Sequence, residues 1–289
     1  MALVCAMLLL TGCVGGLRTT KLPVNIGFHP VIGHDTRAAS ESVPFPEDES
    51  FKVYAESGLF GGYYLDNEEI SHTAEGWLAS RKWPEAELHF EAYWPTDLNP
   101  EYSRSEGLQI RNFNPIEYGK APLLATAESD YEIDTLVTLR FDYILSRIEF
   151  RMLHSLSEDM SVRLTGIEIS GFSLSGDYNT KASRDWTTGK ASDSYVVFKA
   201  PQGQALDIPA GKAAYIGDEF FGIPQNSVAS LKVDYEVRFG TAEWVPQSTV
   251  IESFSTDWQQ SKHYTYTLNL QMDKLTYTTG ISSWTNREE

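Results

Sequence analysis

The sequence predicts an all-β protein made of two antiparallel β-sandwich domains in tandem. Three observations support this prediction: apolar and polar residues alternate over many short segments, turn-forming residues separate these segments, and no long helical period competes. Such alternation is typical of a strand with one face in a hydrophobic core and the other in water. Many short strands with regular turns indicate sandwiches rather than a parallel α/β sheet.

The first predicted strand covers residues 22–33, near the N-terminus. Its apolar residues share one face and are Leu22, Val24, Ile26 and Phe28. A small, polar segment that carries Arg37 follows it and has no strand pattern. Further alternating sets predict strands in residues 88–94, 137–141, 148–152, 231–239 and 264–272. A helix of a turn or two is expected near residues 121–127.

The domain boundary is predicted from a change of phase. Apolar residues occupy odd positions over 137–141 and even positions over 148–152. A shift of one residue moves side chains to the other face of a strand, which suits a chain passing from one sheet to another. We therefore expect an N-terminal domain over residues 38–144 and a C-terminal domain over residues 145–289, joined with almost no linker.

The N-terminus has the pattern of an export signal. Residues 2–10 form an apolar run of about nine residues, too short to span a bilayer and suited to a signal peptide. The run ends in LTGC at 10–13, which is similar to a bacterial lipobox, so Cys13 is the expected site of lipid attachment after removal of residues 1–12. A signal peptide cut elsewhere, or a buried strand, is the alternative. Because Cys5 leaves with the signal, we expect no intramolecular disulfide.

Composition argues against several classes of function. The formal net charge is -17, and an acidic surface repels phosphate backbones, so nucleic acid is not an expected partner. The six histidines are scattered without metal-ligand spacing, and no nucleophile elbow or phosphate-binding glycine loop occurs. We expect no cofactor, no metal and no catalytic residue. His89 and His263 fall on the polar phase of their strands, which predicts solvated positions.

Tryptophans offer another reading, because aromatic rings can stack on sugars. Trp94 is in phase with core residues, so core packing is expected for it, whereas Trp77 and Trp83 are left open. Paired carboxylates for a secreted glycosidase cannot be identified among 40 aspartates and glutamates.

The order of several short motifs resembles the fimbrillin family, the subunits of type V pili of Bacteroidota. After the lipobox cysteine and the first strand come TRA at 36–38 and FKVYA at 51–55. FEAYWP at 90–95, PLLA at 122–125 and LRFDYILSRIEF at 139–150 follow, and HYTYTLNL at 263–270 and ISSW at 281–284 stand near the C-terminus. Together they cover nearly the whole mature chain.

The resemblance implies two transthyretin-like β-sandwich domains and a lipoprotein precursor held in the outer membrane. It also implies that an arginine-specific protease cuts between Arg37 and Ala38, releasing the lipidated segment 13–37 with its strand. A strand of another pilin subunit then fills the vacancy by donor-strand exchange. The implied product is a surface fimbrium that supports adhesion to a host protein or glycan receptor. The alternative for Arg37 is an ordinary loop residue.

The expected donor strand lies in residues 274–284, where Leu275, Tyr277 and Ile281 share one phase. The same segment can equally be the last strand of its own domain. The resemblance therefore implies a structural pilus subunit or a fimbrillin-like assembly protein. The alternative is a cell-surface lipoprotein that stays uncut and binds glycans.

Overall fold

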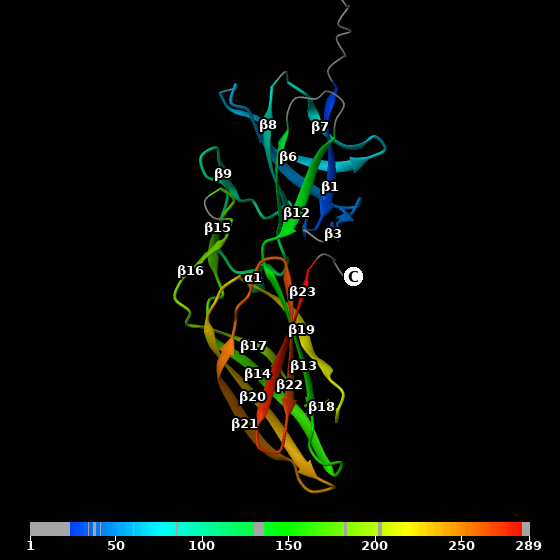
Figure 1. Ribbon diagram of the computed structural model, residues 1–289, viewed down its shortest axis with the longest axis vertical. Coiled ribbons are helices and arrows are strands. Elements are labelled where there is room, and N and C mark those ends of the chain that lie inside the picture. The colour runs from blue at the N-terminus through cyan, green and yellow to red at the C-terminus, as the bar shows by residue number, and fades with distance from the viewer. Residues whose placement is uncertain are drawn as a thin grey trace, which may run out of the picture.

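The computed structural model describes residues 24–33, 35–36, 39–40, 42–59, 61–84, 86–129, 136–181, 184–201 and 204–284. The regular secondary structure of these residues is nearly all strand, which confirms the predicted all-β sandwich class. Figure 1 shows an N-terminal half and a C-terminal half stacked along the long axis of the molecule. In the described part of the chain, no helix is long and apolar enough to cross a membrane.

The main sheet of the N-terminal half has strands in the order β12-β11-β8-β5-β6-β7-β1-β4. Because β1 also pairs with β12, the order closes on itself. The strands are β1 (Asn25–Ile32), β4 (Val43–Pro44), β5 (Ser50–Glu56), β6 (Tyr63–Thr73), β7 (Gly76–Lys82), β8 (Leu88–Trp94), β11 (Leu123–Ser129) and β12 (Val137–Tyr143).

The C-terminal half packs two sheets face to face around one cluster of buried side chains. The first sheet has the order β19-β13-β22-β23, with β13 (Ser146–His154), β19 (Ala214–Gly222), β22 (Lys262–Leu270) and β23 (Leu275–Ser283). The second has the order β17-β14-β20-β21, and β18 also pairs with β14; its strands are β14 (Met160–Phe172), β17 (Asp193–Lys199), β18 (Leu206–Ile208), β20 (Val228–Phe239) and β21 (Val245–Ser255). Most neighbours are antiparallel, as predicted, but β1–β12 and β13–β22 are parallel.

A smaller sheet and a short pair complete the described strands. The sheet has the order β16-β15-β10-β9, with β9 (Glu101–Ser103), β10 (Gly107–Phe113), β15 (Gly176–Asn179) and β16 (Trp186–Thr188). The pair is β2 (Asp35–Thr36) with β3 (Ala39–Ser40).

The predicted alternation matches the observed cores. Val137, Leu139 and Phe141 of β12 are buried in the N-terminal cluster, and Ile148, Phe150 and Met152 of β13 are buried in the C-terminal cluster. Only Ile144 and Leu145 separate β12 from β13. The change of phase therefore coincides with the passage of the chain from one sheet to another.

Two apolar residues of the predicted sets leave the core. Phe239 is 62% exposed because it is the last residue of β20, and Met272 is 76% exposed because it lies in the turn between β22 and β23. Alternation identifies the face of a strand but not where the covering sheet ends.

The two halves are not divided simply by position in the chain. The segment that carries β15 and β16 lies in the predicted C-terminal domain, yet β15 pairs with β10 of the other half. Its Tyr178 and Trp186 belong to the N-terminal hydrophobic cluster, together with Ile223 and Trp284. A boundary in sequence at residues 144–145 therefore separates the main sheets but not these returning segments.

The predicted helix at residues 121–127 is wrong, because residues 123–129 form β11, which pairs with β8 along its whole length. Among the described residues the α-helix is α1 (Pro115–Tyr118). The Asn114 side chain caps it by accepting from the Ile116 and Glu117 amides, and Gly119 ends it at φ 74°. The sequence NPIEYG at 114–119 was the signal that could have located this turn.

Candidate functional site

The site with the strongest structural definition is the place of β1 between two other strands. On one side β1 runs parallel to β12, with Phe28 opposite Val137. On the other side it runs antiparallel to β7, with Phe28 opposite Trp77, and β4 extends this side beyond Pro30. Both edges of β1 are thus hydrogen-bonded, and its neighbours depend on it for part of their pairing.

The side chains of β1 are deeply buried. Ile26 is 0% exposed and Phe28 is 2% exposed, and Val31 and Ile32 are buried as well. The Phe28 ring makes edge contacts with the rings of Phe51 and Phe90, with centroids 5.9 and 5.7 Å away. The strand therefore supplies a substantial part of the core of the N-terminal half.

The sequence-predicted face of this strand is only partly the buried one. Val24 is 38% exposed, because it lies just before β1. Its carbonyl accepts a hydrogen bond from the Trp83 amide at 2.9 Å. Leu22 lies outside the described residues. Val31 and Ile32 were not among the expected residues, and their burial comes from the strand's continuation between β12 and β4.

The C-terminal segment forms β23, the edge strand of its own sheet. All nine residues from Leu275 to Ser283 pair antiparallel with β22. Only Leu275 is buried along β23, while Tyr277 is half-buried and Ile281 is 63% exposed. The candidate donor strand is thus held mainly by backbone hydrogen bonds on one side.

Trp284, directly after β23, anchors the end of this strand at the junction of the halves. Its ring stacks on Tyr143 at 3.8 Å between centroids and on Phe221 at 5.4 Å. Its amide donates to the Ser261 carbonyl at 2.9 Å. The sequence motif at 281–284 contained this residue, but its alternation could not show what Trp284 contacts.

Sequence reasoning also missed a buried carboxylate that ties β8 to β10 and to the chain just after β15. Glu91 of β8 is 0% exposed and accepts hydrogen bonds from the Thr180 hydroxyl at 2.6 Å and the Leu108 amide at 2.8 Å. His89 Nε2 lies 3.0 Å from Glu91 Oε1. His89 is therefore half-buried beside Glu91, and the predicted solvated position for this histidine is wrong. Burial raises the pKa of Glu91, but the hydrogen bonds from His89, Thr180 and Leu108 outweigh it and lower the pKa overall.

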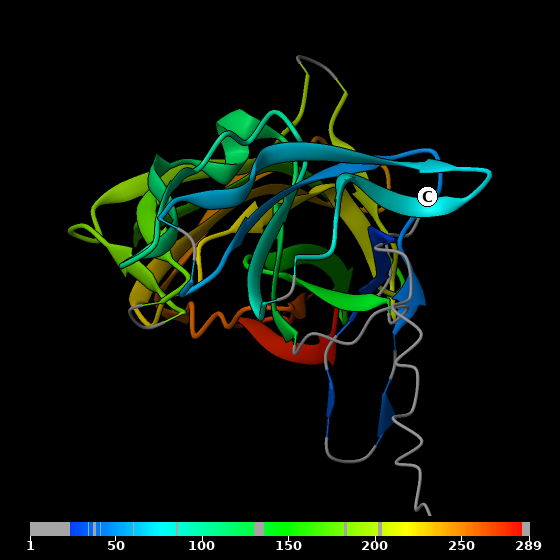
Figure 2. The same ribbon diagram turned by 90° about the horizontal axis from the view of Figure 1, so that it is seen from above.

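The predicted cleavage and lipid sites are outside the described residues: Arg37 and Ala38 are not described, and neither is Cys13. The residues on both sides of Arg37 and Ala38 are described and form the pair β2–β3, with Thr36 opposite Ala39. In Figure 2 this blue pair extends away from the main sheets.

The sequence leaves Trp77 and Trp83 open as sugar-stacking residues and predicts core packing for Trp94, and the structure buries all three. Trp77, Trp83 and Trp94 are 8%, 5% and 7% exposed and belong to the core of the N-terminal half. His263 is half-buried near Glu149, at 3.6 Å, rather than solvated. The described residues contain no group of three or more metal-ligating side chains.

The chain was compared with protein families, with curated protein sequences and with solved structures. The profile of the fimbrillin-like family matches residues 36–284. A search of curated protein sequences finds no match.

Solved structures from Bacteroides share this architecture at low identity. A candidate cell adhesion protein from Bacteroides ovatus has a TM-score of 0.56 and 15% identity, covering 93% of this chain and 100% of the other. A fimbrial protein from Bacteroides vulgatus has a TM-score of 0.52 and 15% identity, covering 90% and 100%. A candidate cell adhesion protein from Bacteroides uniformis has a TM-score of 0.54 and 14% identity, covering 90% and 98%. These likenesses show a shared fold.

Proposed function

The chain belongs to the fimbrillin-like family of fimbrial structural proteins, which are not enzymes, and we propose that it polymerises by exchanging strands. In this proposal a protease cuts after Arg37, β1 leaves the N-terminal half, and β23 of another copy takes its place. Before cutting, a lipid on Cys13 holds the precursor at the outer membrane.

The observation that carries this proposal is the contrast between β1 and β23. Four buried side chains of β1 contribute roughly 1.5–3 kcal/mol each, while β23 buries Leu275 alone. The acceptor position also offers hydrogen bonds on two edges, from β7 and β12, whereas β23 uses one. A strand that moves from the edge position to the vacated position therefore gains both apolar burial and backbone pairing.

Loss of β1 gives the cut subunit a strong tendency to bind a replacement strand. The burial that β1 supplies is comparable with the net stability of a whole domain, about 5–15 kcal/mol. The exposed edges of β7 and β12 would also present unpaired backbone groups. The protruding pair β2–β3 supports access of a protease to the bond between Arg37 and Ala38.

The test compares the purified chain with its Arg37→Ala variant after treatment with an arginine-specific protease. We expect the cut chain to start at Ala38 by N-terminal sequencing and to form polymers on size-exclusion chromatography. The Arg37→Ala variant should stay monomeric. A chain that is cut at Arg37 yet remains a monomer of unchanged size would contradict strand exchange. A mature N-terminus at acylated Cys13 in cells would instead support a lipoprotein that stays uncut.

A further inference from the structure

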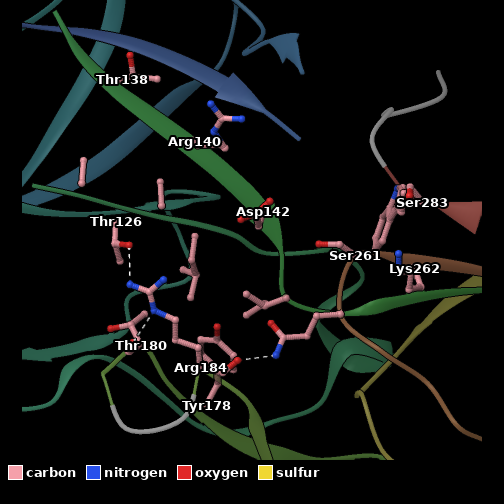
Figure 3. A pocket seen from close by; sticks show the side chains of 16 residues that line it. Thr126, Thr138, Arg140, Asp142, Tyr178, Thr180, Arg184, Ser261, Lys262 and Ser283 are labelled. Carbon is pink, nitrogen blue, oxygen red and sulfur yellow. Dashed lines mark hydrogen bonds between the residues drawn. The ribbon is translucent and has the colours of Figure 1, made fainter. Parts of the chain in front are cut away.

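A cavity of about 740 Å³ opens at the junction of the two halves. Figure 3 shows its lining, to which β11, β12, the segment of β15 and the chain after it, residues 260–262, and the end of β23 contribute. We call it the junction cavity. Its volume falls within the range of small-molecule sites, about 300–1,000 Å³. Neither strand exchange nor the core requires a hollow here.

One wall of the junction cavity is the outward face of β12. Thr138, Arg140 and Asp142 lie on this face, and they alternate with the buried Leu139 and Phe141 of the opposite face. The polar residues of the wall are therefore placed by the same alternation that builds the core, so a rigid strand presents them.

The cavity has a different charge balance from the rest of the protein. Its lining contains three cationic residues, Arg140, Arg184 and Lys262, and one carboxylate, Asp142. The whole chain carries a formal net charge of -17. A concave site with an excess of cationic groups attracts an anionic ligand. Asp142 in the same lining disfavours a doubly charged phosphate more than a singly charged carboxylate.

Arg184 is held in position by both halves. Its Nη2 donates to the Thr126 hydroxyl at 3.0 Å and its Nε to the Thr180 carbonyl at 3.3 Å. Its own carbonyl accepts from the Gln260 side chain at 2.7 Å, and Figure 3 shows these contacts converging on Arg184. Two of five N–H donors are used in this way, which leaves donors for a planar carboxylate. A guanidinium that is already oriented loses less entropy on binding.

The remaining lining suits a ligand that is rich in hydroxyl groups. Thr126, Thr138, Ser261 and Ser283 are half-buried or exposed hydroxyl residues, and Gln260 adds an amide. Apolar residues, among them Leu124, Ala125 and Ile144, make up the rest of the lining, and small-molecule sites commonly combine apolar walls with a few polar groups.

We propose that the junction cavity binds a sugar unit that carries a carboxylate, such as a sialic or uronic acid residue. Arg184 pairs with the carboxylate, Lys262 adds positive charge, and the hydroxyls of Thr126, Thr138 and Ser261 bind the sugar hydroxyls. Because Ser283 and Trp284 line the cavity, the bound sugar also lies beside the end of the C-terminal strand. The proposal concerns the uncut chain and does not depend on strand exchange.

The experiment is isothermal titration calorimetry of the uncut chain with N-acetylneuraminic acid, glucuronic acid and glucose. We expect saturable binding of at least one acidic sugar and at least tenfold weaker binding of glucose. The acidic sugar that binds more tightly identifies the source as a sialylated or a uronate-containing glycan. Acetyl-triglycine, a peptide with a free terminal carboxylate, tests the competing peptide class.

Three variants test the residues. Arg184→Gln and Lys262→Gln should each weaken binding of the acidic sugar, by about tenfold or more for Arg184→Gln. Arg111→Gln is the matched control, because Arg111 is an exposed cation on β10 outside the cavity lining. Thermal unfolding checks that each variant is folded. If Arg184→Gln does not fold, the effect of Lys262→Gln on binding of the acidic sugar tests the proposal in its place.

Four results would overturn the proposal. Neither acidic sugar binds saturably, glucose binds as tightly as they do, acetyl-triglycine binds more tightly, or the variants in the cavity weaken binding no more than Arg111→Gln.

Discussion

The ring of Trp284 stacks on the ring of Tyr143 with centroids 3.8 Å apart and planes within 4° of parallel. Tyr143 is the last residue of β12 in the N-terminal half, and Trp284 follows β23 of the C-terminal half. Rings this close make many van der Waals contacts, whose dispersion energies add to the apolar burial of both side chains. This contact therefore holds both the end of the candidate donor strand and the junction of the halves.

We predict that Trp284→Ala lowers the free energy of unfolding by about 3 kcal/mol, the low end of the range for a buried tryptophan. Amides of β23 should also exchange faster with deuterium, since the strand buries only Leu275 besides its anchor. Chemical denaturation and hydrogen exchange measure the two effects. Ile281→Ala is the control, because this residue of β23 is 63% exposed and should change stability by less than about 0.5 kcal/mol. Equal effects of the two substitutions would refute the anchoring role of Trp284.

We predict that Phe28→Ala destabilises the uncut chain by about 3–5 kcal/mol, because it leaves a cavity between Phe51 and Phe90. Val24→Ala should cost less than about 1 kcal/mol, since Val24 is 38% exposed. Urea unfolding of both variants gives the comparison. If Phe28→Ala is tolerated as well as Val24→Ala, β1 is not an important part of the core.

Glu91 makes stability sensitive to acid. Its pKa is lower in the folded chain than the ordinary value of 4.5, so the ionised form stabilises the fold above that value. This stabilisation is lost as the pH falls below 4.5 and through the folded pKa. Glu91→Gln should therefore flatten the acid side of the stability curve and cost about 1–3 kcal/mol at pH 7.

Thermal unfolding between pH 3 and pH 7 measures this effect. Glu87→Gln is the control, because Glu87 is an exposed glutamate just before β8. The Glu91→Gln curve should be less steep than those of Glu87→Gln and the unmodified chain. Parallel curves for all three proteins would show that Glu91 is not the group responsible.

A chain that lacks residues 274–289 should accept a strand but not donate one. Cut at Arg37 and mixed in excess with the cut full-length chain, it should shorten the polymers by capping one end. Size-exclusion chromatography with light scattering measures the length distribution. The same chain carrying Arg37→Ala is the control and should leave the polymers unchanged. If the deletion chain itself forms long polymers, the donor is not residues 274–284.

The strand content and the core faces could be predicted from the sequence. Alternation over residues 148–152 identified Ile148, Phe150 and Met152 as core residues. This works because successive side chains of a strand point to opposite faces, so the face of each residue follows from its position alone. The same rule located Ile26 and Phe28. It did not locate α1, which lies between its Asn114 cap and Gly119. This helix has only four residues, and a helical pattern of apolar residues cannot be recognised over so short a segment.

The partners of each strand could not be predicted. The pairing of β1 with β12 and β7, the return of β15 to β10, and the contacts of Glu91 join residues that are far apart in the chain. Alternation gives the face of a strand but does not identify its edges' partners, because backbone hydrogen bonds carry no side-chain identity.

By itself, the sequence determined that this protein is a chain of half-buried strands whose first strand has an apolar face. Only the tertiary structure decided that β1 is bonded on both edges and deeply buried, whereas β23 is bonded on one edge and mostly exposed. It also decided that polar residues of β12 and Arg184 face one cavity. The physical reason is that burial and edge pairing depend on which distant strands cover a segment, and that covering is a property of the assembled sheets.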